Sequence, residues 1–164
     1  MTSKRIALVG ALSAIALTIF MLEAQLPPIV PIPGVKLGLA NAVTLVTMAV
    51  LGRKDAGFVL LVRVLLGSVF AGSISALMFS AAGGLLAFLV MALFVGRFSD
   101  GMLWVVSILA AVAHNIGQLT VAVWVSGTPG ILVYAPALLA AGIGTGAFTG
   151  AVSVFLTRAL CKTR

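Results

Sequence analysis

Long apolar runs are the feature that most constrains what this chain of 164 residues folds into. The run from Gly57 to Phe79 is far longer than one β-strand, and short charged or proline-rich segments separate such runs. Charged residues make up only 8% of the chain, against roughly 25% in an ordinary soluble domain. Because too few charges remain to cover a water-facing surface, we expect the apolar surface to face lipid. Lipid accepts only helices and closed barrels, and barrel strands alternate in short segments. The runs therefore predict an all-α integral membrane protein.

Six membrane-spanning helices fit this length at about 20 residues per crossing. We expect a single six-helix transmembrane domain over residues 1–164, with a loop at residues 23–35 that contains four prolines. The predicted helices cover residues 6–22, 36–51, 56–79, 84–95, 102–125 and 134–160, and the fourth is short enough to be re-entrant. The first resembles a signal peptide, with Lys4 and Arg5 before an apolar run. Its length favours a retained helix.

The basic residues lie on one side of this predicted topology. With six crossings, both termini and the connections at Arg53 and Arg97 lie on the same side of the membrane. The loops on the opposite side then contain a single basic residue, Lys36. The residues on the basic side are Lys4, Arg5, Arg53, Lys54, Arg97, Arg158, Lys162 and Arg164. By the positive-inside rule, both termini are cytoplasmic in a bacterial cell membrane. The net charge of +7 thus reflects membrane orientation, and we expect no nucleic-acid partner.

Polar residues within an apolar helix are candidates for a binding site, because burying them in lipid is costly. In the predicted fifth helix, His114 and Gln118 stand one turn apart on one face, and Asn115 lies beside them. Either these side chains bind a substrate, or they hold helices together at about 0.6 kcal/mol each. A single histidine without a nearby acid in the sequence makes no zinc site. We expect no metal and no cofactor.

Two basic residues are further binding candidates. Arg63 lies about 12 Å along the third helix from Asp55, within the hydrocarbon. Three roles are open for the Arg63 side chain. It reaches back to the membrane interface, it forms a hydrogen bond with a structural partner such as a backbone carbonyl, or it contacts an anion, for which a guanidinium is well suited. Lys36 precedes Asn41 at the predicted start of the second helix, where backbone N–H groups attract anions; anchoring to lipid headgroups is its alternative role. Glu23 either pairs with Lys36 or closes the loop.

Small residues recur at four-residue spacing on three predicted helices, which allows neighbouring helices to approach closely. In the third helix they are Gly67 and Ala71. In the last helix they are Gly142, Gly146 and Gly150, for which internal packing is the favoured interpretation. In the first helix they are Ala7 and Ala11. We expect this alanine face to dock another membrane subunit.

The residue pattern does not favour an enzyme. The acids are Glu23, Asp55 and Asp100, and no two are placed as a pair for acid/base work or for holding Mg²⁺. No glycine loop followed by a lysine and a hydroxyl residue is present to bind nucleotide phosphates. The single cysteine, Cys161, makes neither an internal disulfide nor a metal cluster.

Three segments resemble a known family: PGVKLGLAN at residues 33–41, RVLLGS at residues 63–68 and HNIGQ at residues 114–118. The chain is similar, over nearly its whole length, to the Gx transporter family, often labelled heptaprenyl diphosphate synthase component I. Those proteins are similar in turn to the S components of energy-coupling factor transporters, which bind the substrate. The resemblance implies an S-component-like bundle with a capping loop between helices one and two. It also implies a transmembrane coupling subunit that contacts Ala7 and Ala11, and partner ATPases.

Two hypotheses of function follow. The leading one is a membrane protein that takes up a small anionic or amphipathic metabolite. Its predicted substrate-binding residues are Lys36, Asn41, Arg63, His114, Asn115 and Gln118. The alternative is a non-catalytic membrane subunit of a prenyl diphosphate synthase or of a membrane redox complex. Prenyl elongation enzymes hold diphosphate through Mg²⁺ on paired aspartate-rich motifs, and the two aspartates here lie 45 positions apart. We therefore do not expect this chain to run that reaction alone.

Overall fold

The computed structural model describes residues 2–26 and 36–162, which form six α-helices and two short 3-10 helices. The α-helices are α1 (Ser3–Glu23), α2 (Asn41–Leu51), α3 (Arg53–Ala71), α4 (Ile74–Phe94), α5 (Leu103–Ser126) and α6 (Ala135–Lys162). The helix η1 (Asp100–Met102) precedes α5, and η2 (Pro129–Tyr134) precedes α6. The part of the chain that is described contains no β-strand, so the prediction of six helices in an all-α fold is confirmed. Residues 27–35 of the predicted capping loop lie outside the described residues.

Four helices are long and apolar enough to cross a membrane: α1, α4, α5 together with η1, and α6 together with η2. The helix α2 has only 11 residues, and α3 carries Arg53, Lys54, Asp55 and Arg63. Large apolar side chains point away from the bundle, with Ile74 80% exposed and Phe155 72% exposed. These features are consistent with a multi-pass membrane protein. The predicted count of six crossings remains a proposal.

Two helix boundaries near α2 differ from the prediction. α2 begins at Asn41 and not at Lys36, because Gly38 adopts a φ of +79° and accepts a hydrogen bond from the Asn41 N–H at 2.9 Å, which makes a turn. The connection predicted between the second and third helices, at residues 52–55, is also too long. The chain turns at Gly52, with φ +98°, and the charged residues form the first turn of α3. The acid in that turn is favoured by the positive end of the helix dipole.

The largest difference lies between the third and fourth helices, which were predicted at residues 56–79 and 84–95. The helix α3 instead ends where Gly72 adopts a left-handed φ of +60°. Ser73 then caps α4 by accepting a hydrogen bond from the Ala76 N–H at 3.3 Å. α4 is therefore a full helix of 21 residues. The prediction of a short fourth helix is wrong, and a helix of this length and hydropathy is long enough to cross a membrane.

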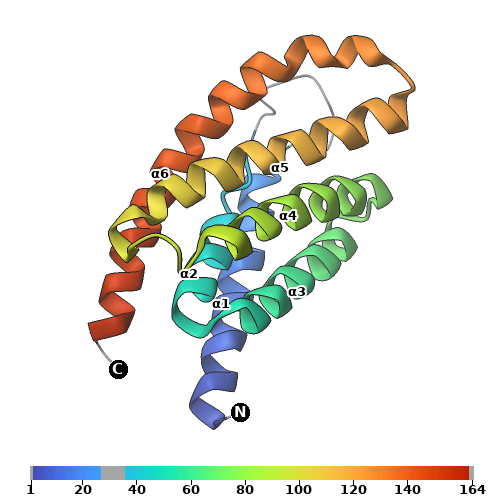
Figure 1. Cartoon of the computed structure of the whole chain (residues 1–164). Coiled ribbons are helices and arrows are strands. Elements are labelled where there is room, and N and C mark those ends of the chain that lie inside the picture. Colours follow the sequence, from blue (N-terminus) through green and yellow to red (C-terminus); the bar gives the residue numbers. More distant parts are fainter. Residues whose placement is uncertain (1, 27–35, 163–164) are drawn as a thin grey trace.

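Glycines set the closest approach between α5 and α6. A Cβ atom added at Gly142, Gly146 or Gly150 would lie 2.5–2.7 Å from atoms of α5. The ladder of glycines on α6 therefore packs inside the bundle, as the favoured interpretation of the sequence had it. Figure 1 shows α5 running between α4 and α6, while α1 packs against α2 and α3.

The largest buried apolar cluster joins α2, α3, α4 and α5. Its members are Leu45, Met48, Ala56, Ala87, Met91, Leu103, Val106 and Ala110. On α5 these residues precede His114, so the apolar cluster separates the middle of that helix from the end of the bundle at which α5 begins.

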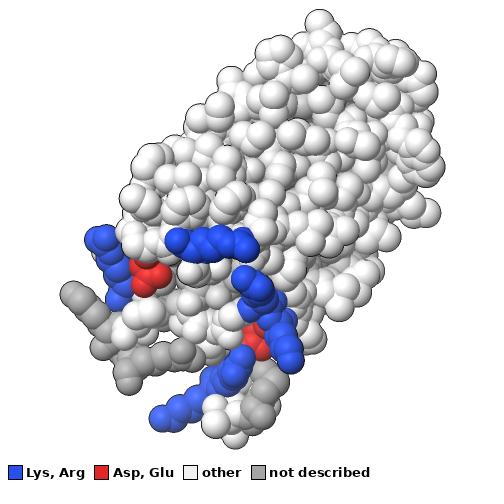
Figure 2. Space-filling model, in the orientation of Figure 1, with Lys and Arg blue, Asp and Glu red and all other residues white. Residues whose placement is uncertain are grey.

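The charged side chains visible in Figure 2 gather at the end of the molecule where both termini lie, and the rest of that face carries none. At this end the Arg5 Nε–H donates to Asp55 Oδ2 at 2.7 Å, and the same guanidinium donates to the Leu51 carbonyl at 3.1 Å. These bonds tie α1 to α2 and α3. The one-sided charge seen in the sequence is thus one-sided in space as well.

Candidate functional site

Polar side chains from five parts of the chain meet inside the bundle. They are Glu23 of α1, Lys36 of the segment before α2, Asn41 of α2, Arg63 of α3, and His114 and Gln118 of α5, and we call them the polar cluster. Lys36 is half-buried, and each of the others is at most 7% exposed. Burying so many polar groups in an apolar bundle is unfavourable unless they bond one another or a ligand.

Asn41 links Arg63 to His114. An Arg63 Nη2–H donates to Asn41 Oδ1 at 3.0 Å, and Asn41 Nδ2 lies 3.1 Å from His114 Nδ1. Because a guanidinium only donates, Asn41 Oδ1 is the acceptor, and the Asn41 Nδ2–H donates to His114 Nδ1. His114 is therefore neutral with its proton on Nε2. That Nε2–H is a buried donor with no hydrogen-bond partner among the described residues.

Two side-chain acceptors hold the segment before α2. The Gly38 N–H donates to Glu23 Oε1 at 2.5 Å, and the Lys36 N–H donates to Gln118 Oε1 at 3.2 Å. Glu23 thereby ties this segment to α1, which is one of the two roles that the sequence left open. The Lys36 Nζ lies 3.3 Å from the centre of the Phe20 ring, a cation–π contact.

The polar cluster holds more donors than acceptors and more positive than negative charge. Lys36 Nζ, Arg63 Nε and His114 Nε2 are all buried and lack hydrogen-bond partners in the described part of the chain. Glu23 is the only acid in the cluster, since the two aspartates of the chain lie in the first turn of α3 and in η1. Two cations and one carboxylate leave a formal charge of +1 in the interior.

A small cavity lies within the polar cluster. Its lining comprises Phe20, Glu23, Lys36, Gly38, Arg63, Ser80, His114 and Gln118. A volume of about 10 Å³ is open to the centre of a water molecule, which is room for about one water. A larger ligand therefore requires that part of this lining move apart.

Two glycines of α4 shape the wall of the cavity. A Cβ atom on Gly83 would lie 2.7 Å from both Nδ1 and Cε1 of His114, and one on Gly84 would lie 3.1 Å from an Nη atom of Arg63. α4 thus offers bare backbone to the imidazole and the guanidinium. The fourth helix was predicted to begin at Gly84, whereas both glycines lie within α4 and make room for the polar cluster.

Partial burial changes the acidity of Lys36. Loss of contact with water lowers the pKa of Lys36 below its usual 10.5, Glu23 opposes this shift, and Arg63 adds to it. An additional negative charge beside the ammonium would favour its protonated form.

The structure brings five of the six predicted binding residues together, and Asn115 is the exception. Its Nδ2–H donates to the Leu138 carbonyl of α6 at 2.5 Å, on a different face of α5. Arg63 is 2% exposed and donates to Asn41, so of the three roles left open for it the structure does not support a reach back to the interface. Whether these residues bind a substrate stays a prediction.

Glu23 and Phe20 line the cavity but were absent from the predicted binding residues. The signal for Glu23 was its position as an acid at the end of an apolar run, next to the proline-rich segment. Phe20 carried no signal, because an aromatic residue in an apolar helix is ordinary.

The alanine face of α1 is open. Ala7 and Ala11 are exposed, as are Gly10 and Ala14 on the same side of the helix. The docking of another membrane subunit on this face stays a prediction.

An apolar α-helical bundle with its charges at one end and a polar cluster inside indicates a membrane protein with an internal polar site. The chain belongs to the family described as Heptaprenyl diphosphate synthase component I, whose match covers residues 12–156. The family resemblance stated from three segments of the sequence is thereby confirmed, and the further likeness to S components stays a prediction. Comparisons with curated proteins and with solved structures find no match.

Proposed function

We propose that this protein binds a small anionic solute in the polar cluster and takes it up across the membrane, like the S component of an energy-coupling factor transporter. One observation carries the proposal. The donors Lys36 Nζ, Arg63 Nε and His114 Nε2 are buried and unpartnered among the described residues, and Glu23 alone opposes two cations.

The charge of the polar cluster favours an anion. An isolated ion costs tens of kcal/mol to bury in a medium of low dielectric constant, so a ligand that brings the formal charge from +1 to zero is favoured. A carboxylate or phosphate also offers several oxygen lone pairs as hydrogen-bond acceptors to the three donors. Two of its oxygens can accept parallel hydrogen bonds from one guanidinium. We therefore assign the site to a small carboxylate or phosphate compound.

The position of the polar cluster fits uptake from outside the cell. From Arg5 to Glu23, α1 rises by about 27 Å at 1.5 Å per residue, so Glu23 lies far from the charged end. By the positive-inside rule, the charged end faces the cytoplasm. On this proposal the chain crosses a bacterial cell membrane six times, with both termini inside and the polar cluster toward the outer surface.

Uptake against a gradient requires energy, and the chain has no phosphate-binding glycine loop of the nucleotide-binding kind. We assign that role to a coupling membrane subunit with ATPases, docked on the exposed face that includes Ala7 and Ala11. The chain itself then catalyses no reaction.

A second candidate function rests on the family description, which names a synthase component. On that alternative the chain is a non-catalytic membrane subunit of a prenyl diphosphate synthase or of a membrane redox complex. The polar cluster would then only hold α1, α2, α3 and α5 together.

Thermal unfolding in the presence of anions tests the first proposal, because a ligand that binds only the folded state raises its stability. A set of small carboxylates and phosphates is compared with chloride at equal ionic strength. At least one of these anions is expected to raise the Tm of the wild type saturably. Arg63→Met should abolish the rise, and Arg97→Ala, at an exposed arginine outside the cluster, should preserve it. No stabilisation by any of these anions, together with co-purification of a synthase subunit, would favour the alternative.

A further inference from the structure

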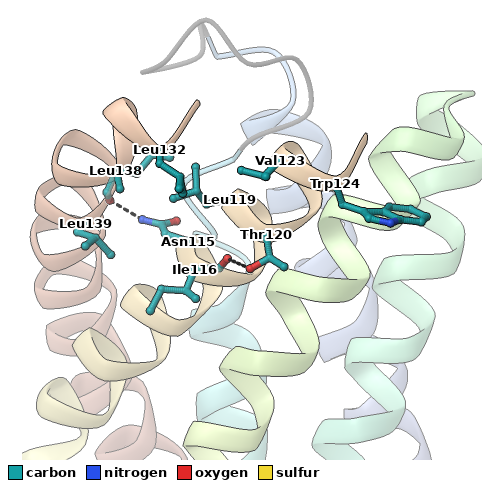
Figure 3. Close-up of a pocket in the computed structure, with 10 residues that line it drawn as sticks. Asn115, Ile116, Leu119, Thr120, Val123, Trp124, Leu132, Leu138 and Leu139 are labelled. Atoms are coloured by element: carbon teal, nitrogen blue, oxygen red, sulfur yellow. Dashed lines mark hydrogen bonds between the residues drawn. The ribbon is translucent and has the colours of Figure 1, made fainter. Parts of the chain in front are cut away.

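A second cavity lies on another side of α5, away from the polar cluster. It is a groove of about 500 Å³ between the second half of α5, η2 and the start of α6. Figure 3 shows its lining, which is mostly apolar and includes Leu119 and Trp124 of α5 and Leu132 and Leu139 from η2 and α6.

Asn115 lines this groove and has one polar atom, Oδ1, without a hydrogen-bond partner among the described residues. The Asn115 Nδ2–H donates to the Leu138 carbonyl, so the orientation of the amide is set and Oδ1 is its other end. Asn115 is 2% exposed, lines the groove, and has its Oδ1 buried without a hydrogen-bond partner in the described part of the chain. In Figure 3 this oxygen is turned away from Leu138, on the side of Leu119.

The neighbouring hydroxyl does not satisfy this oxygen. The Thr120 Oγ1–H donates to the Ile116 carbonyl at 2.8 Å. The Asn115 Oδ1 is therefore a buried acceptor in apolar surroundings, an arrangement that is unfavourable until a donor reaches it.

The groove opens toward the surface that faces lipid. Trp124 is 75% exposed, Leu132 is 52% exposed and Ile116 is 48% exposed, and both flanking helices are long and apolar enough to cross a membrane. An occupant would therefore enter from the bilayer, with its apolar part against the leucines.

We propose that this groove binds a membrane-dissolved molecule with a long apolar chain and a neutral hydroxyl head, of the long-chain alcohol class. Its hydroxyl donates to Asn115 Oδ1, and its chain lies along the apolar walls. Among the described residues, no lysine or arginine lines the groove, so its chemistry does not suit an anion. Site and ligand class both differ from those of the polar cluster, and this inference stands whether or not the proposed function is correct.

Trp124 supplies the test, because it lines the groove and Trp104 is the only other tryptophan in the chain. The Trp104→Phe variant is placed in lipid nanodiscs, and the fluorescence of Trp124 is followed. The protein is titrated with a long-chain alcohol that carries bromine on its chain and, separately, with the matching brominated alkane. Bromine atoms near the indole quench its fluorescence. The alcohol is expected to quench saturably and to bind about two- to tenfold more tightly than the alkane, the range that one hydrogen bond supplies.

Two variants locate the effect. Asn115→Leu keeps a similar volume without the acceptor, so the affinity for the alcohol should fall to that for the alkane. Ala135→Phe fills the groove from α6 and leaves Asn115 intact, so both ligands should bind more weakly. Equal affinities of the parent protein for alcohol and alkane, quenching that does not saturate, or a preference for the alcohol that survives Asn115→Leu would overturn the proposal. If Asn115→Leu does not fold, the parent protein and Ala135→Phe still decide.

Discussion

Replacing Gly83 by alanine probes how the polar cluster is built. The added Cβ would lie 2.7 Å from Nδ1 and Cε1 of His114 and 3.1 Å from Cγ of Gln118. His114 is held by its hydrogen bond with Asn41, so it cannot move aside without lengthening that bond or separating α4 from α5. We expect Gly83→Ala to destabilise the protein.

The expected magnitude follows from the contacts. Overpacking a well-packed interior costs about 1–3 kcal/mol, and the loss of a hydrogen bond adds about 0.5–1.5 kcal/mol. The better helix propensity of alanine offsets about 0.5–1 kcal/mol. A net loss of about 1–3 kcal/mol lowers the Tm of a domain of this size by about 2–12 °C, at about 2–4 °C per kcal/mol.

A matched control lies on α6. A Cβ atom added at Gly144 would meet no atom within 4 Å, so Gly144→Ala should leave the Tm unchanged or raise it slightly. Thermal unfolding of both variants in one detergent, followed by tryptophan fluorescence, makes the comparison. A Gly83→Ala protein as stable as Gly144→Ala would refute the packing of the imidazole against α4.

Three further predictions concern other parts of the molecule. Arg5→Ala should lower the free energy of unfolding by only about 0.2–1 kcal/mol, because Arg5 is half-exposed and exposed ion pairs contribute little. Denaturant unfolding measures this loss, with Lys4→Ala as the neutral control. A larger loss would contradict the prediction. Anion binding should weaken as the pH rises through the lowered pKa of Lys36, because only the protonated amine attracts an anion; Lys36→Arg should remove this dependence in a titration of affinity against pH. Leucine at both Ala7 and Ala11 should abolish co-purification of a coupling subunit without lowering the Tm, and unchanged co-purification would remove that docking face.

The sequence predicts the helices well where polar or proline-rich segments interrupt the apolar runs. The start of α5 was placed within one residue because Arg97 and Asp100 mark the connection before it. The break at Gly72 was missed because no charged residue or proline marks it, and the serines there stand between apolar residues. Only the left-handed backbone of Gly72 and the cap by Ser73 end one helix and begin the next.

The polar cluster could be predicted in part, because the cost of burying polar groups applies to each residue separately. That cost singled out Arg63 and His114 without any knowledge of their neighbours. The direction of Asn115 depends on which helix packs beside α5. Adjacent residues of a helix do not share a face, and α6 provides the carbonyl that Asn115 bonds.

The role of Glu23 needed three-dimensional information, because its partner is the backbone N–H of Gly38. A backbone group has no signature in a sequence pattern. The groove beside Asn115 was likewise not predicted, since its size depends on how far α5 and α6 separate next to η2.

The central claim is that the positive polar cluster holds an anion, and native mass spectrometry of protein purified from its host membrane tests it most directly. The account predicts a small anionic molecule retained at one copy per chain by the wild type and by Arg97→Ala, and lost from Arg63→Met. Wild-type protein that retains no such molecule and gains none when the small carboxylates and phosphates are added would contradict it.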